Sequence, residues 1–89
     1  MDQYTAKEMF NSFVNELFNP IDDYSRNDIM YSIGYEFQPL NTRAECSCDN
    51  GIVTAKLFYN MRRNSTFPDK WELIATYVID TDKKTIEEL

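Results

Sequence analysis

The sequence predicts an α+β fold in which one N-terminal amphipathic helix packs on an antiparallel sheet of three to five strands with meander topology. Apolar residues near the N-terminus recur at helical spacing, the middle of the chain contains a hairpin signal, and apolar and polar residues alternate over residues 71–79. The chain has 89 residues, of which 43% are hydrophobic. A chain of this length and hydrophobic content can form one hydrophobic core, so we expect a single domain over residues 1–89.

The helix is expected over residues 5–18, because the apolar side chains there form one wide stripe at helical spacing. The stripe comprises Met9, Phe10, Phe13, Val14, Leu17 and Phe18. Thr5 and Glu8 have the spacing of a capping box, in which each side chain bonds the free backbone N–H of the other residue. Tyr4 and Met9 then occupy the two positions of a hydrophobic staple.

The segment after this helix has two interpretations. Apolar residues alternate with more polar ones over residues 29–37, which favours a strand. The apolar positions are Ile29, Tyr31, Ile33, Tyr35 and Phe37. The same segment also fits a helix that Ser25 caps and Gly34 ends, with Ile29, Met30 and Ile33 facing inward. We expect the strand and keep the helix as the alternative.

Asn50-Gly51 predicts a two-residue β-hairpin, because a type I′ turn needs positive φ at both central residues. Centring the turn there places Glu45 opposite Lys56 and Ser47 opposite Thr54, both favourable pairs on one face. The other face then contains Ala44, Cys46, Cys48, Val53, Ala55, Leu57 and Tyr59.

This register accounts for both cysteines as small core residues, and we expect them to be buried, reduced and free of metal. One residue separates them, whereas structural zinc sites usually have two to four and redox dithiols use Cys-X-X-Cys. Asp80 and Asp82 resemble the start of a calcium loop, but the following glycine and the final acid are missing. A turn is therefore expected at that position.

Residues 71–79 predict a strand with two distinct faces. One face contains Trp71, Leu73, Ala75, Tyr77 and Ile79, and the other contains Glu72, Ile74, Thr76 and Val78. Residues 85–89 are expected to form either a short returning strand or the first turn of a helix.

The sequence lacks the residues that many enzymes use. It contains no histidine, the commonest general base and transition-metal ligand, and its two glycines are isolated, so a glycine-rich phosphate loop is absent. We therefore expect a non-enzymatic protein without a cofactor. No apolar run suits a membrane span and no secretion signal is evident, so we expect a cytoplasmic location without membrane binding.

The net charge is −6, which disfavours direct binding to nucleic acid because that binding depends on Lys and Arg. Acidic residues are concentrated in residues 21–50, where six acids accompany two arginines. We hypothesise that one acidic face binds a basic site on a partner protein: Asp22, Asp23, Asp28 and Glu36. Small acidic proteins from phages or mobile elements imitate the charge of DNA in this way. The chain would then be a stoichiometric, anti-defence type inhibitor of a protein that handles nucleic acid.

The second hypothesis is a structural or regulatory subunit, or an immunity-type protein, that binds through the sheet face opposite the helix. The apolar residues expected there are Phe58, Ile74 and Val78, with Phe67 in the adjoining loop. The same face would also suit a homodimer. The third hypothesis is a small-ligand binder or carboxylate-dependent enzyme, although one helix on a sheet leaves little room for a deep cleft.

Overall fold

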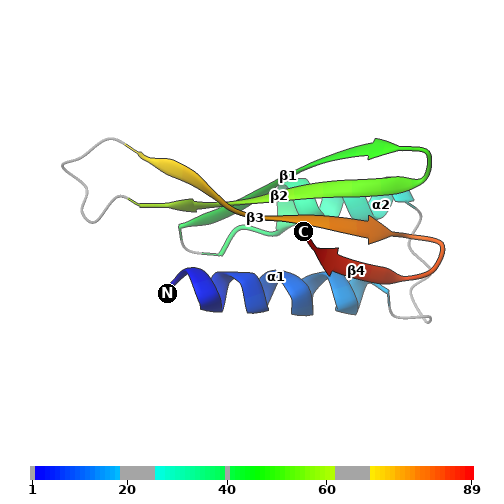
Figure 1. Ribbon diagram of the computed structural model, residues 1–89, viewed down its shortest axis with the longest axis horizontal. Helices are drawn as coiled ribbons and strands as arrows, with labels where there is room; N and C mark the ends of the chain where they lie inside the picture. The colour runs from blue at the N-terminus through cyan, green and yellow to red at the C-terminus, as the bar shows by residue number, and fades with distance from the viewer. Residues whose placement is uncertain (1, 19–25, 40, 62–68) are drawn as a thin grey trace.

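The computed structural model describes residues 2–18, 26–39, 41–61 and 69–89, and it has the predicted α+β architecture (Figure 1). Within these ranges the sheet has four antiparallel strands in the order β1-β2-β3-β4, which is a meander. The elements are α1 (Gln3–Leu17), α2 (Arg26–Tyr31), the π-helix η1 (Ser32–Glu36), β1 (Thr42–Asp49), β2 (Ile52–Asn60), β3 (Trp71–Asp80) and β4 (Thr85–Glu88).

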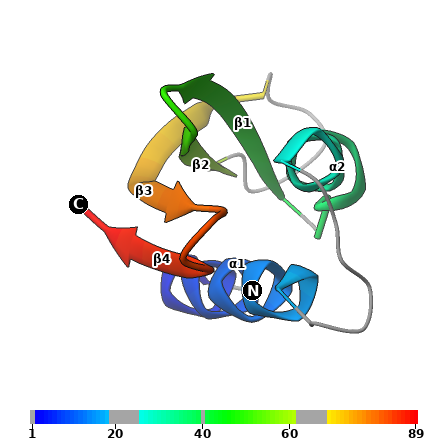
Figure 2. The same ribbon diagram turned by 90° about the vertical axis from the view of Figure 1, so that its right-hand side faces the viewer.

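Both helical segments lie on the same face of the sheet. The end-on view in Figure 2 shows α1 below β4 and α2 beside β1, with the curved sheet around them. The core fills the space between these layers. Its centre is Phe10, whose ring lies 5.1 Å from the ring of Phe37 and 4.8 Å from that of Tyr77. Phe10 and Tyr77 are both fully buried.

The helix α1 begins earlier than its sequence predicted, and the capping box was wrong. Asp2 is the N-cap, and its carboxylate accepts a hydrogen bond from the backbone N–H of Thr5 at 2.8 Å. The Asp2 carboxylate therefore satisfies one of the backbone N–H groups in the first turn of the helix, which have no partner within the helix. Tyr4 and Met9 are both exposed, so they form no hydrophobic staple. The buried residues of the helix are Ala6, Phe10, Val14 and Leu17.

The predicted strand over residues 29–37 was wrong, and the helical alternative is correct. Ile29, Ile33 and Phe37 are buried, whereas Tyr31 and Tyr35 between them are exposed. Ile29, Ile33 and Phe37 are four residues apart, and a helix places residues at this spacing on one side. A pattern of apolar residues at every second position always contains such a set, so it also fits a helix. Gly34 does not end this helix, because η1 continues to Glu36. The proposed cap at Ser25 lies outside the described residues.

The hairpin prediction is confirmed in every pair that it specified. The register places Asp49 opposite Ile52 and continues without a break to Ala44 opposite Leu57. Asn50 and Gly51 have φ values of 52° and 81°, which are the positive values that a type I′ turn requires.

A β-bulge in β3 changes the predicted faces of that strand. Leu57 pairs with Ala75, but the next residue, Phe58, pairs with Leu73, so Ile74 is the extra residue. Ile74 packs against the core, and Leu73 is 51% exposed although alternation had placed it on the core face. Beyond the bulge Ala75, Tyr77 and Ile79 are buried as predicted.

The returning strand at the C-terminus is present as β4. The preceding residues form the expected turn, in which the carboxylate of Asp80 accepts hydrogen bonds from the backbone N–H groups of Asp82 and Lys83, both at 3.0 Å. This carboxylate therefore stabilises a turn. The described residues contain no group of three or more His, Cys, Asp or Glu side chains placed to hold a metal ion.

Candidate partner-binding surfaces

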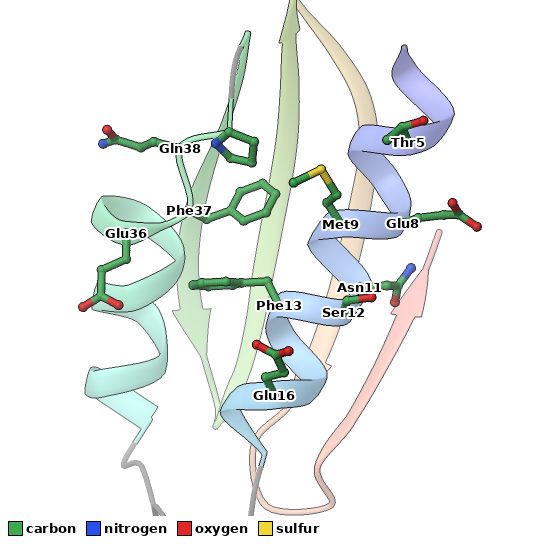
Figure 3. Close-up of a pocket in the computed structure, with 11 residues that line it drawn as sticks. Thr5, Glu8, Met9, Asn11, Ser12, Phe13, Glu16, Glu36, Phe37 and Gln38 are labelled. Atoms are coloured by element: carbon green, nitrogen blue, oxygen red, sulfur yellow. The ribbon is translucent and has the colours of Figure 1, made fainter. Parts of the chain in front are cut away.

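An open groove of about 970 Å³ runs between α1 and the segment that follows η1 (Figure 3). We call it the interhelical groove. The described residues that line it are Thr5, Glu8, Met9, Asn11, Ser12, Phe13, Glu16, Glu36, Phe37, Gln38 and Pro39. The helix α1 packs on β4 and η1 packs on β1, and the lining residues of the groove come from these two helical segments and residues 37–39. Figure 2 shows the two segments side by side on one face of the sheet.

The floor of the interhelical groove is apolar. The rings of Phe13 and Phe37 lie 5.2 Å apart and close the gap between α1 and the residue that follows η1. Met9 lies one turn before Phe13 and is 39% exposed. Phe13 is partly buried against the core and Met9 is exposed, so these two side chains leave apolar area open in the groove, whereas Phe37 is buried.

Three glutamates are among the lining residues. Figure 3 shows Glu16 between the two helical segments, whereas Glu36 extends away from the floor on η1 and Glu8 extends from the opposite side of α1. The hydroxyl of Tyr4 hydrogen-bonds to the Glu8 carboxylate, and this bond raises the pKa of Tyr4. The described residues that line the groove include no Lys or Arg. No cation of the described lining therefore neutralises the three glutamates.

Along the sequence, the excess of acidic residues lies in the first forty residues. Residues 1–40 contain seven acidic and two basic residues, whereas residues 41–89 contain eight acidic and seven basic residues. Of the two bases on the helical side, Lys7 forms an ion pair of 2.7 Å with Glu88 of β4. Among the residues that the structure describes, the helical ranges 2–18 and 26–39 contain five acids and two bases, and the ranges 41–61 and 69–89 contain eight acids and five bases. Both parts therefore have a net charge of −3.

Only part of the predicted acidic face comes together in this groove. Glu36 lines it, whereas Asp28 is exposed on α2 and is not among the lining residues. Asp22 and Asp23 lie outside the described residues. The sequence reasoning missed Glu8 and Glu16. With Ser12 they form a polar row at four-residue spacing beside the apolar stripe, a signal that the sequence does contain.

The outer face of the sheet contains a second cluster, around Arg43. Its guanidinium lies 4.5 Å from the ring of Trp71 and 5.5 Å from that of Phe58, which are cation–π distances. The same guanidinium lies 3.8 Å from the carboxylate of Glu45. The exposed Leu73 pairs with Phe58 beside this cluster.

The predicted apolar face is present in altered form. Phe58 and Val78 are partly exposed on strands β2 and β3, Ile74 packs against the core, and Phe67 lies outside the described residues. The alternating pattern predicts Trp71 and Leu73 on the core face, but the bulge, which has no signal in the sequence, turns them outward.

The two cysteines differ in exposure. Cys46 is half-buried, its thiol donates a weak hydrogen bond to the carbonyl of Met30 at 3.4 Å, and burial raises its pKa. Cys48 is exposed, so the prediction of its burial was wrong. It lies on the inward side of the hairpin, but the described residues from Ser47 to Asn50 are all exposed, because the helices cover only the first half of β1.

Comparisons with protein-family models, with curated proteins and with solved structures find no match. None of the described helices is both long and apolar enough to cross a membrane.

Proposed function

We propose that this chain is a non-enzymatic module that binds a basic surface of a partner protein through its helical side. Its action would be that of a stoichiometric inhibitor that occupies a nucleic-acid-handling site. The observation that supports this best is the interhelical groove, whose described lining residues include Glu8, Glu16 and Glu36 beside an apolar floor and include no base. A Lys- or Arg-rich segment with apolar side chains has the complementary chemistry.

The carboxylates of the helical segments favour a basic partner. The described helical ranges, residues 2–18 and 26–39, contain five acids and two bases, so a basic segment is attracted to them. Such a field increases the rate of encounter more than it slows dissociation. The apolar floor then supplies the short-range contacts, because Phe13 and Met9 are large side chains with area still open to a ligand.

The first experiment captures binding proteins from a host extract at two salt concentrations, about 50 mM and about 500 mM. The higher concentration screens interactions between exposed charges, so a protein that binds through charge is lost there. Proteins lost at high salt are then purified, and association rates are measured with the triple variant Glu8→Gln, Glu16→Gln, Glu36→Gln. We expect slower association and a flatter salt dependence. The matched control neutralises three exposed sheet residues, Glu45→Gln, Glu72→Gln and Glu87→Gln, and should associate nearly as fast as wild type.

The predicted residues outside the groove need their own variant. Replacing Asp22, Asp23 and Asp28 with Asn tests whether the acidic surface extends beyond α2.

A DNA oligonucleotide in excess should compete with the chain for the partner, because both would occupy the same basic site. Equal association rates for the groove variant, the sheet control and wild type would remove the proposal.

The cluster on the outer sheet face supports a second candidate, a regulatory or structural subunit that binds through apolar contacts. Leu73 is 51% exposed beside the aromatic rings that flank Arg43, so a partner there would bury Leu73 and the edge of Trp71. In that case Leu73→Ala should raise the dissociation rate, the three groove substitutions should have little effect, and binding should persist at high salt.

A further inference from the structure

The strand β1 is a long open edge of the sheet. The order β1-β2-β3-β4 leaves β1 and β4 at the two edges. The strand β4 has four residues and ends in Glu87 and Glu88, and this shortness and like charge discourage pairing. The strand β1 has eight residues and contains no proline. An open edge of this length is a template for another strand.

The unpaired backbone groups of β1 can be assigned from the hairpin. In a two-residue turn the flanking residues, here Asp49 and Ile52, form a hydrogen-bonded pair, and such pairs alternate along the ladder. The backbone groups of Ala44, Cys46 and Cys48 therefore point away from β2. Among the described residues no backbone partner occupies these three positions, whereas the N–H of Thr42 donates to the carbonyl of Pro39. The open edge thus begins at Ala44.

A hollow of about 490 Å³ lies beside this edge, between β1 and the helices α2 and η1. Its helical wall contains Tyr31, Gly34 and Tyr35, and its strand wall is Ala44–Cys46. The centroids of the two tyrosine rings lie 5.0 Å apart with the rings tilted by 32°, and the side chains remain 59% and 69% exposed. An aromatic pair beside an open strand edge offers contact area to the inward side chains of an added strand.

We propose that β1 pairs antiparallel with β1 of a second copy of this chain, about a twofold axis through Cys46. The charges of β1 are self-complementary in this register. Arg43 lies opposite Asp49 of the second copy, and Glu45 lies opposite Ser47 of the second copy. Moving the axis by one residue would set Glu45 against either Glu45 or Asp49 of the other copy, and like charges directly opposite destabilise a sheet.

The same register accounts for the exposed thiol of Cys48. Pairing places Cys48 opposite Ala44 of the second copy, which is a wall of the hollow. An unpaired cysteine is among the residue types most often buried, and here the inward side of the hairpin leaves it uncovered. The dimer covers it with a second copy, and one eight-stranded sheet results with all helices on one side.

The test is the dimer dissociation constant, measured by sedimentation velocity on the full chain over a concentration series. Asp49→Arg should raise this constant about 3- to 30-fold, because each dimer then has two like-charged pairs in place of two favourable ones. The charge exchange Arg43→Asp with Asp49→Arg should restore it. Asp82→Arg makes the same change of net charge at the distant turn before β4, and it should leave the dimer unaffected or slightly tighter.

A second measurement needs no substitution. The rate at which a maleimide labels Cys48 in the wild-type chain should fall as the dimer fraction rises, while circular dichroism stays unchanged. A chain that remains monomeric at millimolar concentration overturns the proposal. So does equal weakening by Asp49→Arg and by the charge exchange, or a dimer in which Cys48 labels as fast as in the monomer. Because no partner protein is needed, these outcomes are separate from those that test the proposed function.

Discussion

The side chain of Tyr77 lies at the centre of the core and gives the sharpest stability prediction. Its hydroxyl is fully buried and has no hydrogen-bond partner among the described residues. A buried polar group left unsatisfied costs about 1–3 kcal/mol. Replacement by Phe removes this cost and leaves a void smaller than a methyl group, which costs less than about 1 kcal/mol. We therefore expect Tyr77→Phe to stabilise the fold by about 1 kcal/mol.

Thermal and urea unfolding at neutral pH measure this effect. A gain of about 1 kcal/mol in a domain of this size raises Tm by about 4–8 °C. Tyr35→Phe is the matched control, because Tyr35 is 69% exposed and its hydroxyl is open to water. The control should stay within about 0.5 kcal/mol of wild type. A Tyr77→Phe variant less stable than wild type would show that the hydroxyl has a partner and would refute the reasoning.

The pH dependence of Tyr77 provides an independent check. Burial, with the carboxylate of Glu88 nearby, raises the pKa of Tyr77 from 10.0 to about 12. A group whose pKa is higher in the folded state contributes stability that is present below pH 10 and is lost as pH rises toward 12. Wild type should therefore lose stability over this interval relative to Tyr77→Phe. If the free energies of unfolding of the two proteins changed with pH in the same way, the burial of Tyr77 would be contradicted.

The remaining predictions concern the helices. Phe10→Ala should cost about 3–5 kcal/mol and Phe13→Ala about 1–2 kcal/mol in urea unfolding, because Phe10 is fully buried and Phe13 partly so. Equal losses would mean that the groove floor is part of the core. Gly34→Ala should raise the free energy of unfolding by about 0.5–1 kcal/mol, since a Cβ there meets no described atom within 4 Å. Asp2→Ala should lower Tm at pH 7. The pKa of Asp2 is lowered from 3.8 by its bond to Thr5, so this difference should close as pH falls further below that value, and a constant difference would argue against the cap.

The groove could be anticipated only in part from the sequence. The acidic surplus is a matter of composition, and the row of Glu8 and Glu16 follows from helical spacing. Placing Glu36 across from them required the helical path of residues 26–36. The pattern of residues 29–37 fits a strand and a helix equally, because burial at every fourth position satisfies both periods. Packing of Ile29, Ile33 and Phe37 on the finished sheet decides between them.

What the sequence by itself determined were the features with short-range causes. Asn50-Gly51 has the positive φ values that one turn type requires, so it determined the register of β1 and β2. The stripe through Phe10 and Val14 determined the buried side of α1. Only the tertiary structure decided the bulge at Ile74, the outward turn of Leu73 and the exposure of Cys48. Each of these depends on where the sheet curves and where the helices end, and such long-range packing leaves no local signal in the chain.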